Sequence, residues 1–167
     1  ALIVKSLLAE ETRPRMEETD HGTLIMLRGL NHNPGPEPED LVSIRLWVTD
    51  QRIITVSRRR AGAVSDLEER LRMQRGPKKG GEFLAMLCGC LNEGIEPALQ
   101  NLEDDLDTLD EAAADTPDAG LRSQLANVRK QATMFRRHLS PLRDVVTRLQ
   151  QADHLGMTKT DRWNMHD

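Results

Sequence analysis

Apolar residues recur at steps of three and four through the second half of the chain, from Leu84 to Leu149. This spacing keeps them on one face of an α-helix and is typical of the seam between coiled-coil partners. The pattern therefore predicts two long helices. The first stripe comprises Leu84, Leu87, Leu91, Ile95, Ala98, Leu102, Leu106, Leu109 and Ala113, and the second comprises Leu121, Leu125, Val128, Ala132, Phe135, Leu139, Leu142, Val146 and Leu149.

A short break separates the two stripes. Thr116 is a suitable N-cap there, and Pro117 suits the first position of a second helix. A chain that folds back through residues 114–118 forms a long antiparallel helical hairpin, which we predict over residues 79–152. Pro97 lies inside the first helix and predicts a kink.

The two predicted helices carry opposite charge. From Arg122 to Arg148 there are seven basic residues and only Asp144 against them. An exposed ion pair contributes only about 0 to 1 kcal/mol, so we expect the apolar stripes to stabilise the hairpin and the charges to select partners. Between Pro97 and Leu121 every charged residue is acidic: Glu103, Asp104, Asp105, Asp107, Asp110, Glu111, Asp115 and Asp118.

The first half of the chain indicates strands. Thr23 to Leu30 is mostly apolar, and from Val42 to Val48 apolar residues alternate with Ser43, Arg45 and Trp47. This alternation predicts a strand with one buried face. Arg52 to Ser57 predicts a further strand in hairpin contact. Residues 31–40 contain three prolines and predict a loop.

Short helices are expected on either side of these strands. Ala1 to Arg13 suits a helix that ends before Pro14, and Ser65 to Gln74 suits an amphipathic helix closed by Gly76-Pro77. We predict a partial α/β domain over residues 1–78, with a strand meander near 15–58 and a short helix over 63–75. The helical hairpin over 79–152 packs on it, and residues 153–167 form the start of a further helix or a frayed tail.

Composition narrows the class of protein. The 167 residues suit one compact unit, and 38% apolar with 30% charged residues and a net charge of -4 indicates a soluble chain. Four aromatic residues argue against a stacking platform for single-stranded nucleic acid. The longest apolar run, Phe83 to Leu91, is about half of the roughly 20 residues that cross a bilayer as a helix. Two cysteines favour a reducing compartment, with the cytosol as the default.

Candidate metal ligands are sparse. Cys88 and Cys90 are two residues apart on a predicted helix and point about 200° away from each other, which favours a buried structural role over a shared ion. The histidines are scattered, without the spacing of a helical zinc site. The densest group of possible ligands lies near the end of the chain, where a solvated tail is the favoured interpretation: Asp153, His154, Asp161, His166 and Asp167.

Catalytic and phosphate-binding patterns are weak. We find no Ser-His-Asp or Cys-His spacing, so we assign no catalytic residue, no cofactor-binding residue and no metal ligand, and we expect a protein that is not an enzyme. Arg52 and Arg58 to Arg60 are more consistent with a charged strand end than with a nucleic-acid site. Residues 76–81 lack the Gly-Lys-Ser/Thr ending of a phosphate loop and predict a flexible joint.

The order of these elements resembles the cytoplasmic domain of CorA-like metal-ion transporters, most closely their ZntB-type zinc branch. The resemblance covers most of residues 11–149. It rests on four segments: Glu11-Thr12-Arg13-Pro14-Arg15, Leu27-Arg28-Gly29-Leu30-Asn31, Glu39-Asp40-Leu41-Val42-Ser43-Ile44-Arg45-Leu46-Trp47 and Ser140-Pro141-Leu142-Arg143-Asp144-Val145-Val146.

The resemblance implies an α+β fold: an α/β/α layered domain with a mixed or antiparallel sheet and a long helical hairpin, truncated at both ends. It implies a place on the cytoplasmic side of the inner membrane of a bacterium, in a homopentamer anchored by transmembrane helices outside this chain. A stalk helix would start near residues 159–167. The transported ion would be zinc or magnesium.

The favoured function is therefore the cytoplasmic domain of a divalent metal-ion transporter, which forms the intracellular funnel and regulates ion passage. Its partners would be copies of itself and divalent cations, with no bound cofactor and no nucleic acid. The alternative is a free-standing soluble module that docks another protein's helix on its helical hairpin. A weaker third option is a phosphate- or nucleic-acid-binding regulator that uses Arg52 and Arg58 to Arg60.

Overall fold

A computed structural model describes residues 2–10, 13–31, 41–115 and 119–165 of the chain. In these residues, four strands form one antiparallel sheet in the order β1-β2-β3-β4. The strands are β1 (Arg15–Thr19), β2 (Gly22–Leu30), β3 (Leu41–Val48) and β4 (Ile53–Val56). The helices are α1 (Leu2–Leu8), α2 (Gly62–Arg72), α3 (Gly80–Asp115), α4 (Ala119–Gln151) and α5 (Lys159–Asn164), with a 3-10 turn η1 (Asp153–Leu155).

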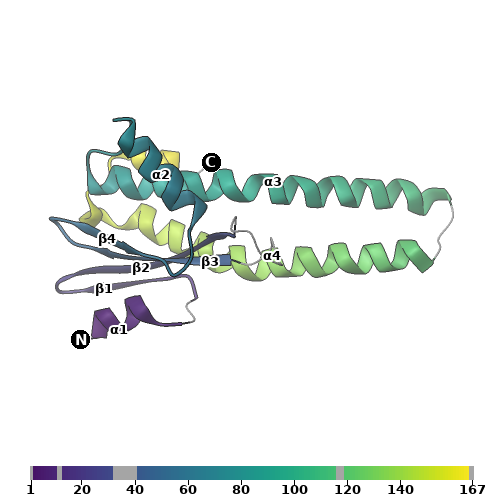
Figure 1. Ribbon diagram of the computed structural model, residues 1–167, viewed down its shortest axis with the longest axis horizontal. Coiled ribbons are helices and arrows are strands. Elements are labelled where there is room, and N and C mark those ends of the chain that lie inside the picture. The colour runs from purple at the N-terminus through teal and green to yellow at the C-terminus, as the bar shows by residue number, and fades with distance from the viewer. Residues whose placement is uncertain (1, 11–12, 32–40, 116–118, 166–167) are drawn as a thin grey trace.

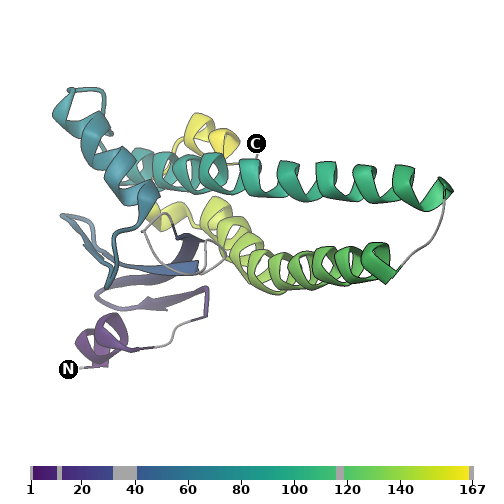
Figure 2. The same cartoon turned by 45° about the vertical axis from the view of Figure 1, so that its right-hand side comes forward.

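Helices cover both faces of the sheet (Figure 1), α1 on one face and α2, α3 and α4 on the other. The helices α3 and α4 lie side by side in opposite directions and extend well beyond the sheet (Figure 2). We call these two helices the helical arm. The sheet, its covering helices and the root of the helical arm share one apolar core.

The turn between β1 and β2 and the turn between β3 and β4 are tight. Gly22 pairs with Thr19 across the first turn and has φ +149°, and a Cβ there would lie 2.4 Å from the carbonyl oxygen of Val48. Only glycine fits this position. Val48 pairs with Ile53 across the last turn, which confirms the predicted hairpin between β3 and β4. The predicted meander begins near residue 15, where β1 begins, but β1 was not delimited as a separate strand, because Met16 is its one buried residue and leaves no alternation to detect.

The alternation from Val42 to Val48 predicts one buried face for this strand, and that prediction is wrong. Trp47 packs with Leu24 and Met26 against Leu7 of α1, so the second face is also covered. Arg45 lies on that face and is only 2% exposed. A short helix from a distant part of the sequence closes this side, and the strand pattern alone does not reveal it.

The helix α2 ends earlier than predicted. Its C-cap is Met73, and Gln74 takes a left-handed conformation with φ +58°. The amide of Arg75 donates to the carbonyl of Arg70 at 2.8 Å, as in a Schellman motif. Gly76, which was expected to close the helix, lies two residues after Gln74 and packs closely against Leu71. A Cβ at Gly76 would lie 2.4 Å from a methyl carbon of that leucine. The helix α1 also ends before Pro14, at Leu8.

The helical arm keeps most of its predicted seam buried, including Leu102, Leu109, Val128 and Phe135. Two predicted seam positions are exposed, Leu106 at 37% and Ala113. Others are half-buried: Ala98, Leu121, Leu125, Ala132, Leu139 and Val146. The two exposed positions lie in the outer half of α3, where α4 is the neighbouring helix and the sheet does not reach (Figure 2). The α3 helix continues through Pro97, and the kink stays a prediction. Thr116 and Pro117 lie outside the described residues, as does most of the predicted loop 31–40.

The segment after α4 is folded, which corrects the expectation of a frayed, solvated tail. Leu155, Met157 and Met165 are buried in the common core. The carboxylate of Asp153 accepts from Arg162 at 2.6 Å, and Thr158 and Asp161 form a capping box that starts α5. The segment is folded because its apolar residues pack into the core and hold it against α3. His166 and Asp167 lie outside the described residues.

The structure confirms the predicted α+β class, with α/β/α layering, an antiparallel sheet and a long helical hairpin. The division of the chain at residue 78 stays a prediction, as does the start of a stalk helix near residue 159.

Candidate functional site: the charged surfaces of the helical arm

The acidic residues of α3 form an exposed surface on the outer half of the helical arm. We call it the acidic surface: Glu103, Asp104, Asp105, Asp107, Asp110 and Glu111, all exposed. The apolar residues of α3 face α4, so the helical period turns most of these carboxylates toward solvent. Asp118 and the side chain of Asp115 lie outside the description.

The basic residues of α4 form the complementary surface. All seven of them are exposed. One has a structural partner far along the chain, since Arg148 donates to the carbonyl oxygen of Met16 at 2.8 Å and ties α4 to β1. The basic surface comprises Arg122, Arg129, Lys130, Arg136, Arg137, Arg143 and Arg148.

The two charged surfaces do not neutralise each other directly. Among the described residues, no acidic side chain from Glu103 to Glu111 lies within 4.0 Å of a basic side chain of α4. At the root of the helical arm, α3 forms an ion pair with α2 instead of α4: Arg70 lies 3.0 Å from the carboxylate of Glu93. The carboxylates of the acidic surface therefore stay solvated, and they attract cations without binding one at a fixed site.

A hollow of about 470 Å³ lies between α3, α4 and α5, at the root of the helical arm. Its walls are mainly apolar, from Leu91, Ile95 and Leu99 on one helix to Leu139 and Val146 on the other. Arg143 and Glu93 also line it, as does Met165, the C-cap residue of α5.

No metal centre forms in the described part of the chain, where no three His, Cys, Asp or Glu side chains gather as ligands. His154 instead shares a hydrogen bond of 2.9 Å with the hydroxyl of buried Thr23. Burial lowers the pKa of His138, and the guanidinium groups of Arg28 and Arg137 lower it further.

The two cysteines are buried free thiols, as predicted. Burial raises the pKa of Cys88 to about 12 and is the main cause of the raised pKa of Cys90. A thiol with a raised pKa is a poor nucleophile and a poor metal ligand at neutral pH.

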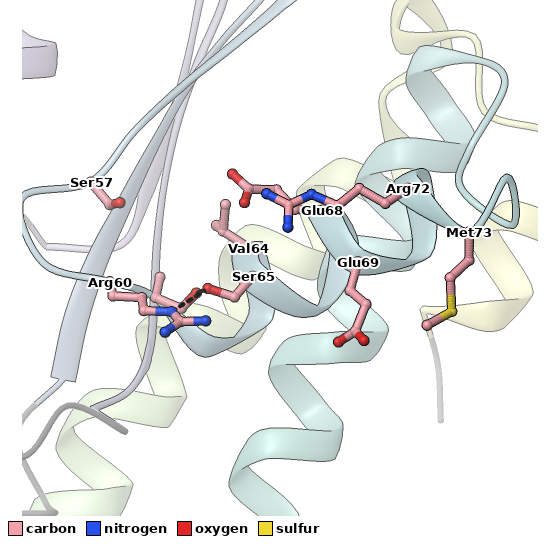
Figure 3. A pocket seen from close by; sticks show the side chains of 9 residues that line it. Ser57, Arg60, Val64, Ser65, Glu68, Glu69, Arg72 and Met73 are labelled. Atoms are coloured by element: carbon pink, nitrogen blue, oxygen red, sulfur yellow. Dashed lines mark hydrogen bonds between the residues drawn. The ribbon is translucent and has the colours of Figure 1, made fainter.

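The arginine cluster after β4 is largely engaged within the protein. Arg58 donates to the carbonyl oxygen of Leu8 at 3.0 Å and pairs with Glu10, so it caps the end of α1. Arg60 donates to the hydroxyl of Ser65 at 3.1 Å, beside an open hollow of about 640 Å³ along α2 (Figure 3). The carboxylates of Glu68 and Glu69 line the same hollow, so its charge is mixed and does not favour an anion.

Arg45 is the polar residue of this region that the sequence pattern missed. Its guanidinium donates to the carbonyl oxygen of Ala9 at 2.7 Å, and its Nε has no hydrogen-bond partner. Burial lowers the pKa of Arg45, and the neighbouring Arg58 and Arg28 lower it further. Together with Arg58, Arg45 satisfies carbonyl groups at the end of α1, where a cation also suits the helix dipole.

No helix in the described part of the chain is both long and apolar enough to cross a bilayer.

Comparison with known proteins finds relatives whose descriptions agree with one another. A family model described as CorA-like Mg2+ transporter protein matches residues 1–167. The chain is 37% identical over 145 residues to the divalent cation transporter CmaX of Pseudomonas aeruginosa, covering 86% of this chain and 44% of that protein. It is 32% identical over 164 residues to the zinc transport protein ZntB of Klebsiella pneumoniae, covering 97% of this chain and 49% of that protein.

Solved structures agree with these matches. Full-length CmaX superposes with a TM-score of 0.81 and 32% identity, over 98% of this chain and 53% of that one. The ZntB cytoplasmic domain of Vibrio parahaemolyticus superposes with a TM-score of 0.83 over 98% of this chain and 68% of that one, and at 24% identity it supports the fold alone. The chain spans about half the length of the curated relatives it matches.

Proposed function

The chain belongs to the CorA-like Mg2+ transporter family, and on that premise we propose that it is the cytoplasmic part of a divalent cation transporter of a bacterial inner membrane. The observation that carries the proposal is the family match along the whole chain, together with relatives named for divalent cation and zinc transport. The same match favours a transporter over a free-standing interaction module.

In this role the chain is not an enzyme. Copies of it assemble as a homopentamer and form a funnel below the pore. The exposed acidic surface lowers the electrostatic energy of divalent cations nearby and so raises their local concentration. Because these carboxylates have no ion-pair partners in the described part of α4, their charge remains effective toward mobile ions. Ion occupancy of the funnel would then regulate ion passage.

Zinc is the transported ion that we favour, with magnesium as the alternative. Curated relatives named as zinc transport proteins cover nearly all of this chain, at 30% to 32% identity. Magnesium is the alternative because the family model is described by Mg2+ transport and CmaX by transport of divalent cations in general.

Uptake by the full-length gene product in proteoliposomes tests the proposal. Zn²⁺ should enter faster than Mg²⁺, and empty liposomes should take up neither. Failure to transport any divalent cation would contradict the proposed activity, and faster uptake of Mg²⁺ would contradict only the preference for zinc.

The role of the acidic surface needs a matched pair of variants. Glu103→Gln, Asp107→Asn and Asp110→Asn together remove three charges from α3, and Arg129→Gln, Lys130→Gln and Arg137→Gln remove three from α4. The first set should slow uptake at low ionic strength, with the difference shrinking as added salt screens the charges. The second set should not slow uptake. Equal uptake by both variants at low salt would contradict the electrostatic role.

A further inference from the structure

We propose that the outer half of α4 is a docking surface for the anionic headgroups of a membrane leaflet. The inference rests on the proposed function, because that function places the chain beside the cytoplasmic face of a membrane. It adds a lipid contact that ion transport itself does not require. The contact residues form the basic edge, which we define as Arg122, Arg129, Lys130, Arg136 and Arg137.

The basic edge lies on one side of α4. At about 100° per residue, its five cations fall within about 120° of the helix circumference. The buried seam residues Val128 and Phe135 lie outside this arc, so the arc faces away from the seam with α3. All five side chains are exposed. The outer half of α4 also extends beyond the sheet, which leaves it free to meet another surface (Figure 2).

No carboxylate of α4 offsets these cations nearby. From Ala119 to Arg143 the sequence has no acidic residue. In the described part of the chain, no carboxylate lies within 4.0 Å of a nitrogen of the basic edge. The same charge acts on His138: burial lowers its pKa most, and Arg28 and Arg137 lower it further. The basic edge therefore keeps its positive charge available to an external anion.

The residues between the cations indicate which kind of anion fits. Apart from the cations, the arc holds only Ala119, Ala126 and Thr133. A protein partner needs an apolar anchor near the centre of its interface, and these small residues offer none. A leaflet of anionic headgroups needs only exposed cations at its surface, where each Lys or Arg strengthens binding about fivefold. The basic edge thus matches a charged leaflet better than a protein.

The acidic surface of α3 does not cancel this attraction. The axes of packed helices lie about 8 to 10 Å apart, and the screening length at physiological salt is about 8 Å. Because the basic edge faces away from the seam, a flat leaflet that contacts it meets the cations first. The carboxylates of α3 lie behind them, so their repulsion is screened.

Co-sedimentation of the 167-residue chain with lipid vesicles tests the proposal. One set of vesicles is pure phosphatidylcholine, and the other contains phosphatidylcholine and phosphatidylglycerol in equal amounts. At low salt the chain should bind the anionic vesicles and leave the neutral ones. This binding should weaken as salt is added.

The measurement needs no ion transport, so it separates this inference from the proposed function. Normal Zn²⁺ uptake by the full-length gene product without vesicle binding by the chain would contradict the lipid contact alone. Vesicle binding without uptake of any divalent cation would contradict the proposed activity alone.

Matched variants locate the contact. The first variant replaces three cations of the basic edge: Arg129→Gln, Lys130→Gln and Arg137→Gln. The control makes the same change at exposed positions around the end of α2: Arg72→Gln, Arg75→Gln and Lys79→Gln. The first should weaken binding to the anionic vesicles about a hundredfold, because it removes three contacts. The control should weaken binding by less than about threefold, through net charge alone. Circular dichroism checks that both variants are folded.

Three results would overturn the proposal. The first is the absence of binding to anionic vesicles at low salt. The second is an equal loss of binding in both variants. The third is duplex DNA that binds the chain more tightly than the anionic vesicles at the same salt concentration and is released by the first variant; this would assign the basic edge to nucleic acid instead.

Discussion

Cys88 illustrates how a single buried group makes the stability of the protein depend on pH. It lies in the common core with 7% of its surface exposed, and burial raises its pKa to about 12 from the ordinary 9.0. The unfolded chain therefore releases this proton at a lower pH than the folded chain. The thiol contributes stability that is complete below pH 9 and is lost as the pH rises toward 12.

We expect the free energy of unfolding to fall between pH 9 and 11 by up to about 1.4 kcal/mol per pH unit from this group alone. Urea unfolding at several pH values measures the slope. Cys88→Ala removes the titrating thiol, so its slope should be smaller even if its stability at pH 7 is lower. Identical slopes for the two proteins would show that Cys88 titrates normally in the fold.

At the scale of elements, the apolar and the charged residues of the helical arm have separate roles. Its buried residues hold α3 to α4, whereas the acidic surface has no ion-pair partner in the part of the chain that the structure describes. The concentration of these charges on one helix is visible in the sequence. That they stay unpaired depends on the distance between the helices, which the spacing does not give.

Leu139→Asp should destabilise the protein by about 2 to 4 kcal/mol, because it places a carboxylate against the apolar side chains that pack around Leu139. Arg136→Glu, three residues earlier and exposed, should change the stability by less than about 1 kcal/mol. Thermal unfolding followed by circular dichroism compares them. Similar shifts of the melting temperature would contradict the assignment of the seam.

The contact between α3 and the segment after α4 gives a second prediction. A Cβ on Gly81 would lie 2.7 Å from the Cα of Met157 and 2.8 Å from the carbonyl oxygen of Gly156. Both are backbone atoms, so Gly81→Ala should displace the segment from α3 and lower the stability.

Gly89 on the same helix is the matched control, since a Cβ there meets nothing within 4 Å. Gly89→Ala should stabilise the protein by about 0.5 to 1 kcal/mol through helix propensity. Hydrogen exchange of residues 153–165 should rise in the first variant and stay unchanged in the second. Unchanged exchange in both would contradict the close contact.

At the scale of the whole molecule, one apolar core links the sheet, α2, the helical arm and the residues after α4. The predicted boundary at residue 78 crosses this core. The connection is built from residues far apart in sequence, such as Met16 with Arg148 and Thr23 with His154. Such a core favours a single cooperative unit over two independent ones.

We therefore expect one unfolding transition. Trp47 is 9% exposed under α1 and reports on the sheet through its fluorescence, while circular dichroism reports mainly on the helices. Trp163→Phe removes the other, 67% exposed indole so that the fluorescence comes from Trp47 alone. The two denaturation curves should coincide. Separate midpoints would support the division at residue 78.

The sequence by itself determined the helical arm, its segregated charge, three of the strands and the family resemblance, because periodicity and local capping depend on neighbours along the chain. Only the tertiary structure decided that α1 buries the second face of the sheet around Arg45, that residues 153–165 return to α3, and that the acidic surface makes no ion pair with α4 in the described residues. These features depend on which distant surfaces meet, and contacts between distant residues leave no period in the sequence.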